Sequence, residues 1–361
     1  MAFLVTDRGH CRSDVQAADK SGPVGVDQLL AALAAQSKKG IIHITMVRLQ
    51  AVAERREVGA VRTLASVVCL LAIAGSAGAQ DLEPKAYSSS PVGAAFLVLG
   101  LAHSTGSVLT DPTLPVTDIE AKINGVPLAA GYTFGLFGRL ALITAAIPYS
   151  WGDVTGRIGE EAGAITRSGL ADARAKLSVN LVGNPAMGLQ EYVKAPRRTI
   201  VGTSLTMTTP TGQYSGTKLI NLGTNRWSFK PEVGIAVPKG PWDFDAYLGV
   251  WLFTNNDDFY PGGRMRSQDR VVALQGHASY TFRPRLWAAV DATWYQGGGA
   301  SVEGGEPSEP LNNSRLGATL SFPMGRQQSF KVAYSSGLAV RTGTNFRTLS
   351  IGWQLLRFTR R

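Results

Sequence analysis

The chain has 361 residues, with 36 lysines and arginines against 26 aspartates and glutamates, and a formal net charge of +10. Its basic residues form no dense stripe, which argues against a nucleic-acid partner. The two cysteines, Cys11 and Cys69, precede residue 80, so disulfides, cysteine-ligated zinc and a thiol nucleophile are excluded from the remainder. All tryptophans and tyrosines follow Ala79, so two kinds of sequence are joined near residue 80.

Residues 1–45 show no pattern that indicates a function. They are too few to bury a core of their own. We interpret them as a non-native or disordered leader, with a small extra domain as the alternative.

Residues 46–79 are ordered like a secretory signal peptide. Four arginines come first, an apolar run of about a dozen residues from Thr63 to Gly75 follows, and small residues end the stretch. The apolar run is too short to span a bilayer comfortably. We therefore predict cleavage between Ala79 and Gln80 and export of residues 80–361.

From residue 80 onward, apolar and polar residues alternate with a period of two, which is typical of strands. Within Gly169–Leu181, for example, Asp172, Arg174 and Lys176 fall on one face, and alanines, leucines and a valine fall on the other. We expect twelve strands, at 92–105, 120–136, 138–150, 168–182, 198–210, 218–237, 242–254, 268–283, 285–297, 312–323, 327–337 and 344–358.

The expected connections alternate in length. Short turns are predicted at 137–138, 239–240, 283–284 and 323–326, and long polar connections at 106–119, 151–167, 255–267 and 298–311. The connection 183–197 is an exception, because it is long where a short turn is expected. Short turns at one end and long loops at the other are typical of outer-membrane barrels. The fold class predicted is all-β: a closed antiparallel transmembrane barrel of about 12 strands. A soluble β-sandwich is the alternative.

Aromatic residues near the predicted strand ends support a membrane barrel, because such rings belong at the lipid–water interfaces. The last strand ends on Phe358, similar to the signal that barrel-assembly machinery recognises in its clients. Phe358 is out of phase with the residues before it, which predicts a bulge near Leu355 and Leu356. The expected interface residues are Trp227, Trp242, Trp287, Trp294, Tyr149, Tyr295 and Phe322.

Five spaced segments resemble one known family, the meta-pathway (MetA) phenol-degradation family of outer-membrane transporters. The resemblance implies an outer-membrane β-barrel and a link to phenol catabolism, and it implies no catalytic residues. The segments are "DLEPKAYSSSPVGAAFL" (81–97), "GLADARAKLSVNLVGNPAM" (169–187), "PTGQY" (210–214), "INLGTNRWSFKPEVG" (220–234) and "FTNNDDF" (253–259).

The exported part carries little sign of enzymatic chemistry. Its only histidines are His103 and His277, and no nucleophile elbow or zinc-binding motif accompanies them. The glycine-rich stretch 295–310 lacks the Lys-Ser/Thr ending of a phosphate loop, and 254–263 is interpreted as a polar turn rather than a cation site. We therefore predict no catalytic residue, no metal site and no cofactor.

The polar strand faces would form the interior of a barrel and, in the functional interpretation, line a lumen that passes a solute. A network of paired charges that fills a narrow barrel is the alternative. The predicted lumen-lining residues are Lys122, Asn124, Asp172, Arg174, Lys176, Lys230, Glu232, Asp243, Asp245, His277, Asp291 and Lys331.

The sequence thus predicts a bacterial outer-membrane channel that admits small, hydrophobic or aromatic solutes passively. Its expected partners are the solute, outer-membrane lipid and lipopolysaccharide, and the barrel-assembly machinery. Two alternatives stay open. One is a closed structural, adhesive or lipid-modifying barrel, and the other is a soluble periplasmic β-sandwich.

Overall fold

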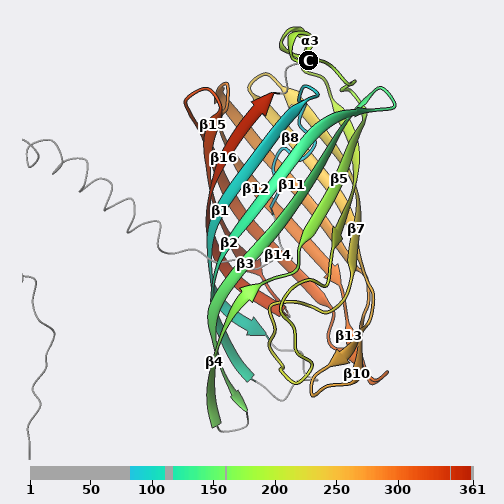
Figure 1. Ribbon diagram of the computed structural model, residues 1–361, viewed down its shortest axis with the longest axis vertical. Helices are drawn as coiled ribbons and strands as arrows, with labels where there is room; N and C mark the ends of the chain where they lie inside the picture. The colour runs from blue at the N-terminus through green and yellow to red at the C-terminus, as the bar shows by residue number, and fades with distance from the viewer. Residues whose placement is uncertain (1–81, 110–116, 159–160, 342, 359–361) are drawn as a thin grey trace, which may run out of the picture. The chain divides into compact units, whose positions relative to one another are not determined.

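The computed structural model of the protein describes residues 82–109, 117–158, 161–341 and 343–358. They form a closed antiparallel barrel of 12 strands, which confirms the predicted fold class (Figure 1). The predicted leader, the signal peptide and the cleavage site at Ala79 and Gln80 lie outside the described residues. Within the described part of the chain, no helix is both long enough and apolar enough to cross a membrane.

The elements follow one another along the chain with one short helix among the strands. Their bounds are β1 (Ala94–Leu109), β2 (Thr117–Leu136), β3 (Arg139–Ile158), β4 (Glu161–Leu170), β5 (Arg174–Val182), α3 (Leu189–Lys194), β6 (Ile200–Thr208), β7 (Ser228–Lys239), β8 (Trp242–Phe253), β9 (Asn256–Phe259), β10 (Arg264–Gln268), β11 (Val271–Arg283), β12 (Leu286–Gly297), β13 (Ala300–Val302), β14 (Leu311–Met324), β15 (Gln328–Ala339) and β16 (Gly343–Phe358).

The barrel closes where its first and last strands meet. β1 pairs with β16 from Ala94 opposite Phe358 to Leu109 opposite Gly343. This pairing runs without a register shift past Leu355 and Leu356, so the bulge predicted there is wrong. Closure leaves no edge at this seam, and a strand edge exposed to lipid would have unpaired backbone groups.

One position in the wall is shared by two strands. β3 pairs with β5 over Ala141–Ala146 and with β4 over Tyr149–Ile158, so β4 and β5 count as one interrupted strand. The prediction placed a loop at 151–167, and this was wrong because β3 and β4 form a long hairpin there. Backbone pairing with β2 overrides the weak strand propensity of the glycines and acidic residues in this stretch.

The short connections lie together at one end of the barrel, here called the turn end. Phe137 and Gly138 have φ angles of 49° and 74°, as expected for a two-residue turn that matches the twist of its strands. The other predicted short turns also lie at this end, after β7, β11 and β14. The predicted exception at 183–197 is present too, and it contains α3 (Figure 1).

The long connections lie at the opposite end, here called the loop end. Two of them carry β9, β10 and β13, which form a separate three-stranded sheet (Figure 1). The strand predicted to begin at 218 begins only at Ser228. Asn221 uses its amide to hold Ser215 and Lys218 in a compact turn instead, and Asn225 adopts a φ of 52°. Asparagine favours both conformations over extended strand.

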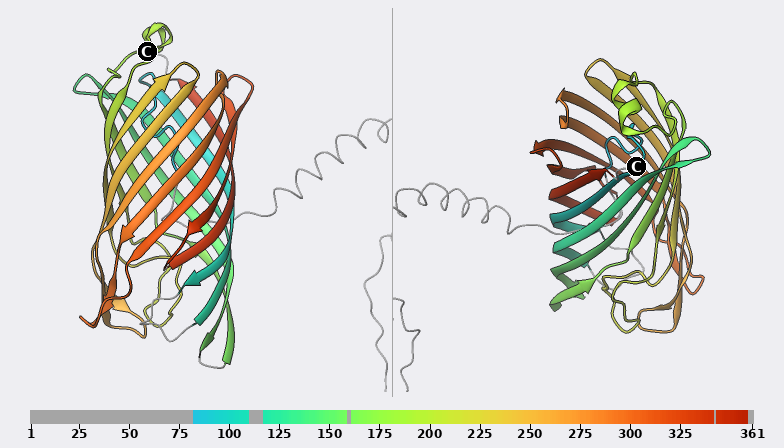
Figure 2. Two further views of the ribbon diagram at one scale, coloured as in Figure 1. Left: turned by 180° about the vertical axis from the view of Figure 1, so that it is seen from behind. Right: turned by 45° about the horizontal axis from the view of Figure 1, so that its top comes forward.

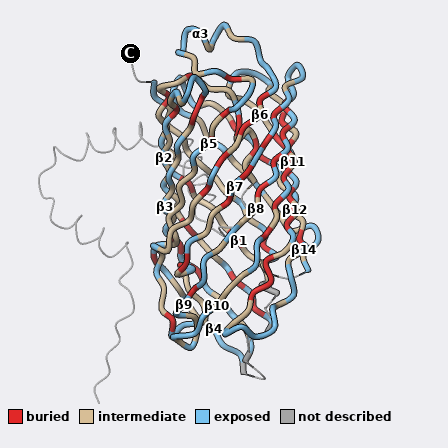
Figure 3. The backbone as a smooth tube through the Cα atoms, turned by 90° about the vertical axis from the view of Figure 1, so that its right-hand side faces the viewer, coloured by how far each residue is buried: buried red, intermediate tan, exposed pale blue. Residues whose placement is uncertain are grey.

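The barrel wall is apolar on its outside and polar on its inside, which is the reverse of a soluble protein. On β7 the outward Val233 is 53% exposed, whereas the inward Glu232 is 3% exposed. β8, β11 and β12 repeat this pattern, as the alternating colours along the strands show (Figure 3). A contiguous apolar belt of this kind is suited to lipid and not to water. The soluble sandwich is therefore excluded on physical grounds.

Several of the aromatic residues expected at the lipid–water interface lie on the outside of the barrel. Trp227 and Trp242 are about two-fifths exposed there, and Trp242 packs edge-on against Tyr280 at 5.0 Å between ring centres. Trp287 and Tyr295 were wrongly expected at the lipid interface. Both lie on the inward face of β12, and Tyr295 is only 4% exposed. Side chains on a strand alternate between its two faces, so the odd-numbered residues of β12 point inward, as Asp291 does at 0% exposure.

Candidate functional site: the barrel interior

The described residues that precede β1, from Leu82 onward, lie inside the barrel instead of extending its wall (Figure 2). We call residues 82–90 the N-terminal plug. The C-terminal side of the plug reaches the wall at the turn end, where the amide of Val92 donates to the carbonyl of Met187 at 2.8 Å. At the far end of the plug, Leu82 packs so closely on Gly317 of β14 that no larger residue would fit there. The plug therefore occupies the interior over several residues.

Tyr87 anchors the plug to β6, β7 and β8. Its side chain is 1% exposed and meets the ring of Tyr247 edge-on, with 5.2 Å between ring centres. A β-carbon on Gly202 or Gly234 would come within 2.2 or 2.3 Å of the Tyr87 ring, so the absence of a side chain at these positions makes room for it. This anchor is a fitted contact and not a loose filling of space.

Lys85 adds polar contacts on the same side. Its backbone amide donates to Asp245 at 3.2 Å, and its ammonium pairs with Asp243. Arg197, in the connection that carries α3, pairs with the other oxygen of Asp243. Asp243 thus joins the plug to a segment outside the wall at the turn end.

Glu83 lies among three cations on the strands. Its carboxylate accepts a hydrogen bond from Lys176 at 2.5 Å. Lys176 holds the pKa of Glu83 well below its usual range, against the effect of burial, and Lys230 and Arg174 act in the same direction. Glu232 is the second anion here, 2.8 Å from Lys230 and 3.7 Å from Lys176. We call Arg174, Lys176 and Lys230 the basic cluster.

Two members of the basic cluster flank an inward-facing indole. The guanidinium of Arg174 lies 5.9 Å and the ammonium of Lys230 lies 5.5 Å from the ring centre of Trp251. Phe253 and Tyr295 continue this aromatic surface toward the loop end. Cations at such distances are attracted to the face of an aromatic ring.

His277 belongs to a buried network in the wall. Its Nδ1 lies 2.7 Å from Asp291, and Thr319 donates to the other oxygen of Asp291 at 2.9 Å. Both members of the pair have fully buried side chains. Ser279, two residues away, makes no hydrogen bond to His277, so no nucleophile–base pair is formed. The arrangement is that of a buried hydrogen-bonded pair in the wall.

The connection between β6 and β7 is held at the loop end by hydrogen bonds to Asp172. Asp172 accepts hydrogen bonds from the amide and hydroxyl of Thr224 and from the amide of Gly212. Arg226 is 9% exposed and lies 4.4 Å from the ring centre of Phe253. Burial lowers the pKa of Arg226 to about 10, so it stays charged at neutral pH.

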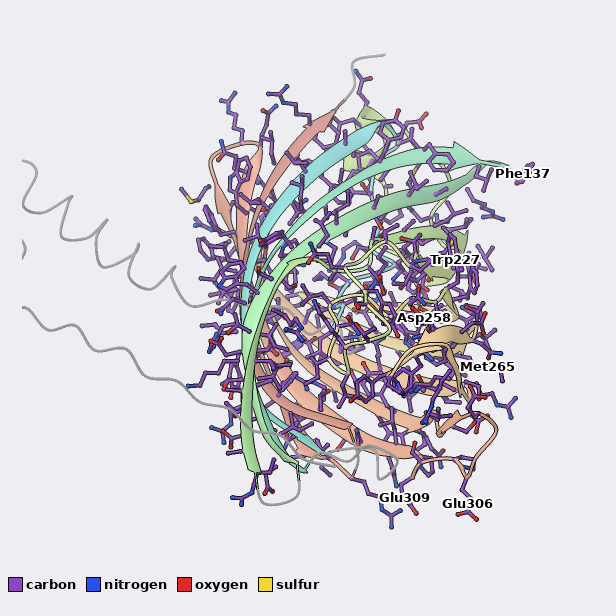
Figure 4. All side chains as sticks on the ribbon, turned by 60° about the horizontal axis from the view of Figure 1, so that its bottom comes forward. Phe137, Trp227, Asp258, Met265, Glu306 and Glu309 are labelled. Atoms are coloured by element: carbon purple, nitrogen blue, oxygen red, sulfur yellow. The ribbon has the colours of Figure 1, made fainter. Side chains whose placement is uncertain are left out.

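The acidic stretch at 254–263 is used by the loops themselves. The amide of Asn256 donates to the hydroxyl of Tyr214 at 2.8 Å, and Asp258 accepts from the amide of Gly263 at 2.9 Å. Figure 4 looks toward this end of the barrel, with Asp258 and Met265 labelled on the inserted strands. Among the described residues, no group of three or more His, Cys, Asp or Glu side chains could hold a metal ion.

Most of the predicted lumen-lining residues point inward. Among the residues that point inward, Lys331 is the most exposed, and its ammonium lies 5.6 Å from the ring centre of Trp287. The inward residues are Arg174, Lys176, Lys230, Glu232, Asp243, Asp245, His277, Asp291 and Lys331.

Asp172 does not line the interior wall as predicted, because it lies in the break between β4 and β5 and pins the connection described above. Lys122 and Asn124 are also corrections. They share the outward face of β2 with Leu128, which is 48% exposed. Asn124 bonds His103 on the outside at 3.3 Å. Both lie toward the loop end of a strand longer than expected, where a polar outward residue can reach water.

The sequence interpretation missed the residues of the plug. The segment "DLEPKAY" stood out by resemblance but was not interpreted as an interior element. Its Glu83 and Lys85 have charges opposite to those of their wall partners Lys176 and Asp243, which was the available signal.

A small cavity lies inside the barrel beside Glu83. Its volume is about 10 Å³, and it is bounded by Arg174, Lys230, Trp251 and Gln275 among others. This volume suits about one water molecule. The cations beside the cavity can bind an anion, and the carboxylate of the plug occupies that place in this conformation.

A closed antiparallel barrel with an apolar outside and a charged inside is a transmembrane β-barrel of the kind found in outer membranes. The chain belongs to the family described as "Putative MetA-pathway of phenol degradation", whose model matches residues 116–355. None of the curated proteins compared with the chain matches it.

Solved structures share the fold at low sequence identity. The chain is similar to the COG4313 outer membrane channel from Pseudomonas putida F1, with 20% identity, a TM-score of 0.63, and 77% of this chain and 100% of that chain covered. It is also similar to the P. putida toluene transporter TodX, with 9% identity, a TM-score of 0.41, and 75% and 92% covered. The transport unit of the Escherichia coli autotransporter AIDA-I gives 10% identity, a TM-score of 0.44, and 82% and 98% covered. The chain shares its fold with the COG4313 channel.

Proposed function

We propose that the protein is an outer-membrane channel for passive entry of small hydrophobic or aromatic solutes, and that the N-terminal plug holds it closed in this conformation. The observation that carries the proposal is the plug itself. It is held in the interior by hydrogen bonds to wall side chains, such as that from the backbone amide of Ala86 to the hydroxyl of Tyr247 at 3.0 Å, and it is not a strand of the sheet. Such a segment can leave without breaking the barrel, whereas a wall strand cannot.

Several observations support the finer parts of the proposal. The family description names phenol degradation, which supports an aromatic solute. The aromatic surface of Trp251, Phe253 and Tyr295 lines the interior toward the loop end. The apolar belt supports residence in outer-membrane lipid, in contact with lipopolysaccharide, after export through the predicted signal peptide and insertion by the barrel-assembly machinery.

A reversible tether tests whether the plug gates the barrel. Ser89 on the plug donates to Asn184 at 2.9 Å, so cysteines at both positions can be joined by a short thiol-specific cross-linker. In planar bilayers, we expect conductance to fall in the cross-linked protein compared with the same protein before cross-linking. Each single-cysteine variant, treated identically, is the control. Equal conductance in the tethered and untethered forms would contradict gating by the plug.

The second candidate is a closed structural barrel. It is favoured by the buried pair of His277 and Asp291, because both side chains are fully buried in the interior. No conductance and no uptake of phenol by proteoliposomes, from protein whose folding is verified by its heat-modifiable gel mobility, would favour that candidate over the channel.

A further inference from the structure

Two carboxylates that belong to different parts of the molecule lie among the basic cluster. Glu83 accepts a hydrogen bond from Lys176, and Glu232 lies 2.8 Å from Lys230 and 3.7 Å from Lys176. Glu232 is fixed in the wall and almost fully buried, whereas Glu83 belongs to the plug. If the plug moves, these cations lose one carboxylate in a partly dehydrated site, where a loss of compensating charge is costly. Departure of Glu83 therefore favours entry of another anion beside these cations.

Two buried polar side chains point to a ligand at the same place. Thr206 and Gln275 are each 3% exposed, and both line the small cavity beside Glu83. The hydroxyl of Thr206 and the amide oxygen of Gln275 have no hydrogen-bond partner among the described residues. Buried polar atoms are nearly always paired with protein, water or a ligand. The hydroxyl of Thr206 can donate to an anion bound in the cavity, whereas the amide oxygen of Gln275 can only accept, from a water molecule or a hydroxyl group of the ligand.

The same cavity has an aromatic side. Trp251 and Tyr295 line it, and the small side chain of Ala273 lies between the strands that carry them. The present volume of about 10 Å³ is too small for a ring. A ring can enter only if the Glu83 side chain leaves, and its departure also frees the cations.

We propose that the basic cluster is a binding site for small aromatic carboxylates, and that Glu83 of the plug occupies it as an internal carboxylate that the solute displaces. This inference rests on the proposed channel function and names a solute class for it. The solute carboxylate takes the place of the Glu83 carboxylate beside Lys176 and Lys230. The ring lies against Trp251, where Arg174 already packs.

The experiment measures binding and not transport, by titrating sodium benzoate into the purified full chain in detergent by calorimetry. We expect Glu83→Gln to tighten benzoate binding by roughly tenfold or more, because it removes the competing charge-assisted contact. Lys230→Gln and Arg174→Gln should weaken binding. Acetate, which lacks the ring, and benzyl alcohol, which lacks the charge, should bind more weakly than benzoate to the Glu83→Gln variant.

Matched controls separate the site from general charge effects. Glu309→Gln removes an exposed loop carboxylate and should leave benzoate affinity unchanged, as should Arg326→Gln at the turn end. Unchanged or weaker benzoate binding in Glu83→Gln would overturn the proposal, and equal affinity for acetate and benzoate would overturn its aromatic part. Because the basic-cluster variants can fail to fold, the gain expected in Glu83→Gln keeps the test decisive.

The proposed function fails in a different experiment. Loss of neutral-solute permeation in liposome swelling would defeat the channel while benzoate binding is retained. Absence of benzoate binding in both the unmodified protein and Glu83→Gln, with permeation retained, would defeat only the site.

Discussion

The hydroxyl of Tyr87 lies 3.1 Å from a carboxylate oxygen of Glu232, which joins the N-terminal plug to the wall of the barrel. The same hydroxyl lies 3.0 Å from Ser204. Glu232 also pairs with Lys230, so Tyr87 connects the plug to the basic cluster.

The first prediction concerns the size of the Tyr87 anchor. Tyr87→Ala should weaken plug docking by about 3–5 kcal/mol, as for other buried aromatic truncations. Tyr87→Phe keeps the ring and should cost only ~1–2 kcal/mol, because it removes hydrogen bonds alone. Conductance in planar bilayers should therefore rise strongly in the first variant and weakly in the second. The reverse order would show that packing is not what holds the plug.

The second prediction uses glycines that the plug requires. Gly202→Ala places a β-carbon 2.2 Å from the Tyr87 ring, so the plug cannot dock as it does here. We expect higher conductance with the barrel intact, because alanine is tolerated in strands. Gly276→Ala is the matched control, since its β-carbon would meet no atom within 4 Å. The idea fails if the two variants conduct alike.

The third prediction tests the coupling between Lys85 and Asp243. Lys85→Gln and Asp243→Asn should each increase open probability in single-channel records, and the double variant should do so by less than the sum. The reason is that both changes remove one partly buried ion pair. Asp243→Asn should have the larger effect, because it also removes the pairing with Arg197. Strict additivity would show that the pair contributes nothing to closure.

The fourth prediction concerns the buried pair in the wall. Asp291→Asn should destabilise the barrel by about 3–5 kcal/mol, because the buried Nδ1 of His277 loses its carboxylate partner. The temperature at which the folded band is lost in heat-modifiability gels should fall.

Lipid hydrolysis should be absent in both the unmodified protein and His277→Ala. Activity that disappears with His277→Ala would instead indicate an enzyme.

The fifth prediction concerns export. N-terminal sequencing of the membrane-bound protein should begin at Gln80, because the small residues before it match a signal-peptidase site. Met1 at the start of the mature protein would refute the signal peptide. Replacement of Ala79 by a bulky residue should slow processing and provides the control.

The sequence by itself determined the sheet. Period-two alternation from residue 80 predicted which residues of β7 and β8 face in or out, since a strand has only two faces. Turn chemistry predicted the short connections, as at Phe137 and Gly138, because few residues accept their backbone angles. The errors at Lys122 and Asn124 arose because face assignment on β2 needs the register with its neighbours.

Only the tertiary structure decided what occupies the interior. Glu83, Lys85 and Tyr87 span too few residues for their spacing to predict an element, and their partners Lys176, Asp243 and Glu232 lie about 90–160 residues away along the chain. Contacts between segments so far apart depend on closure of the barrel, which local propensity does not encode. The pattern of each strand specifies a wall, whereas the plug and the charges that hold it are defined only once twelve strands enclose them.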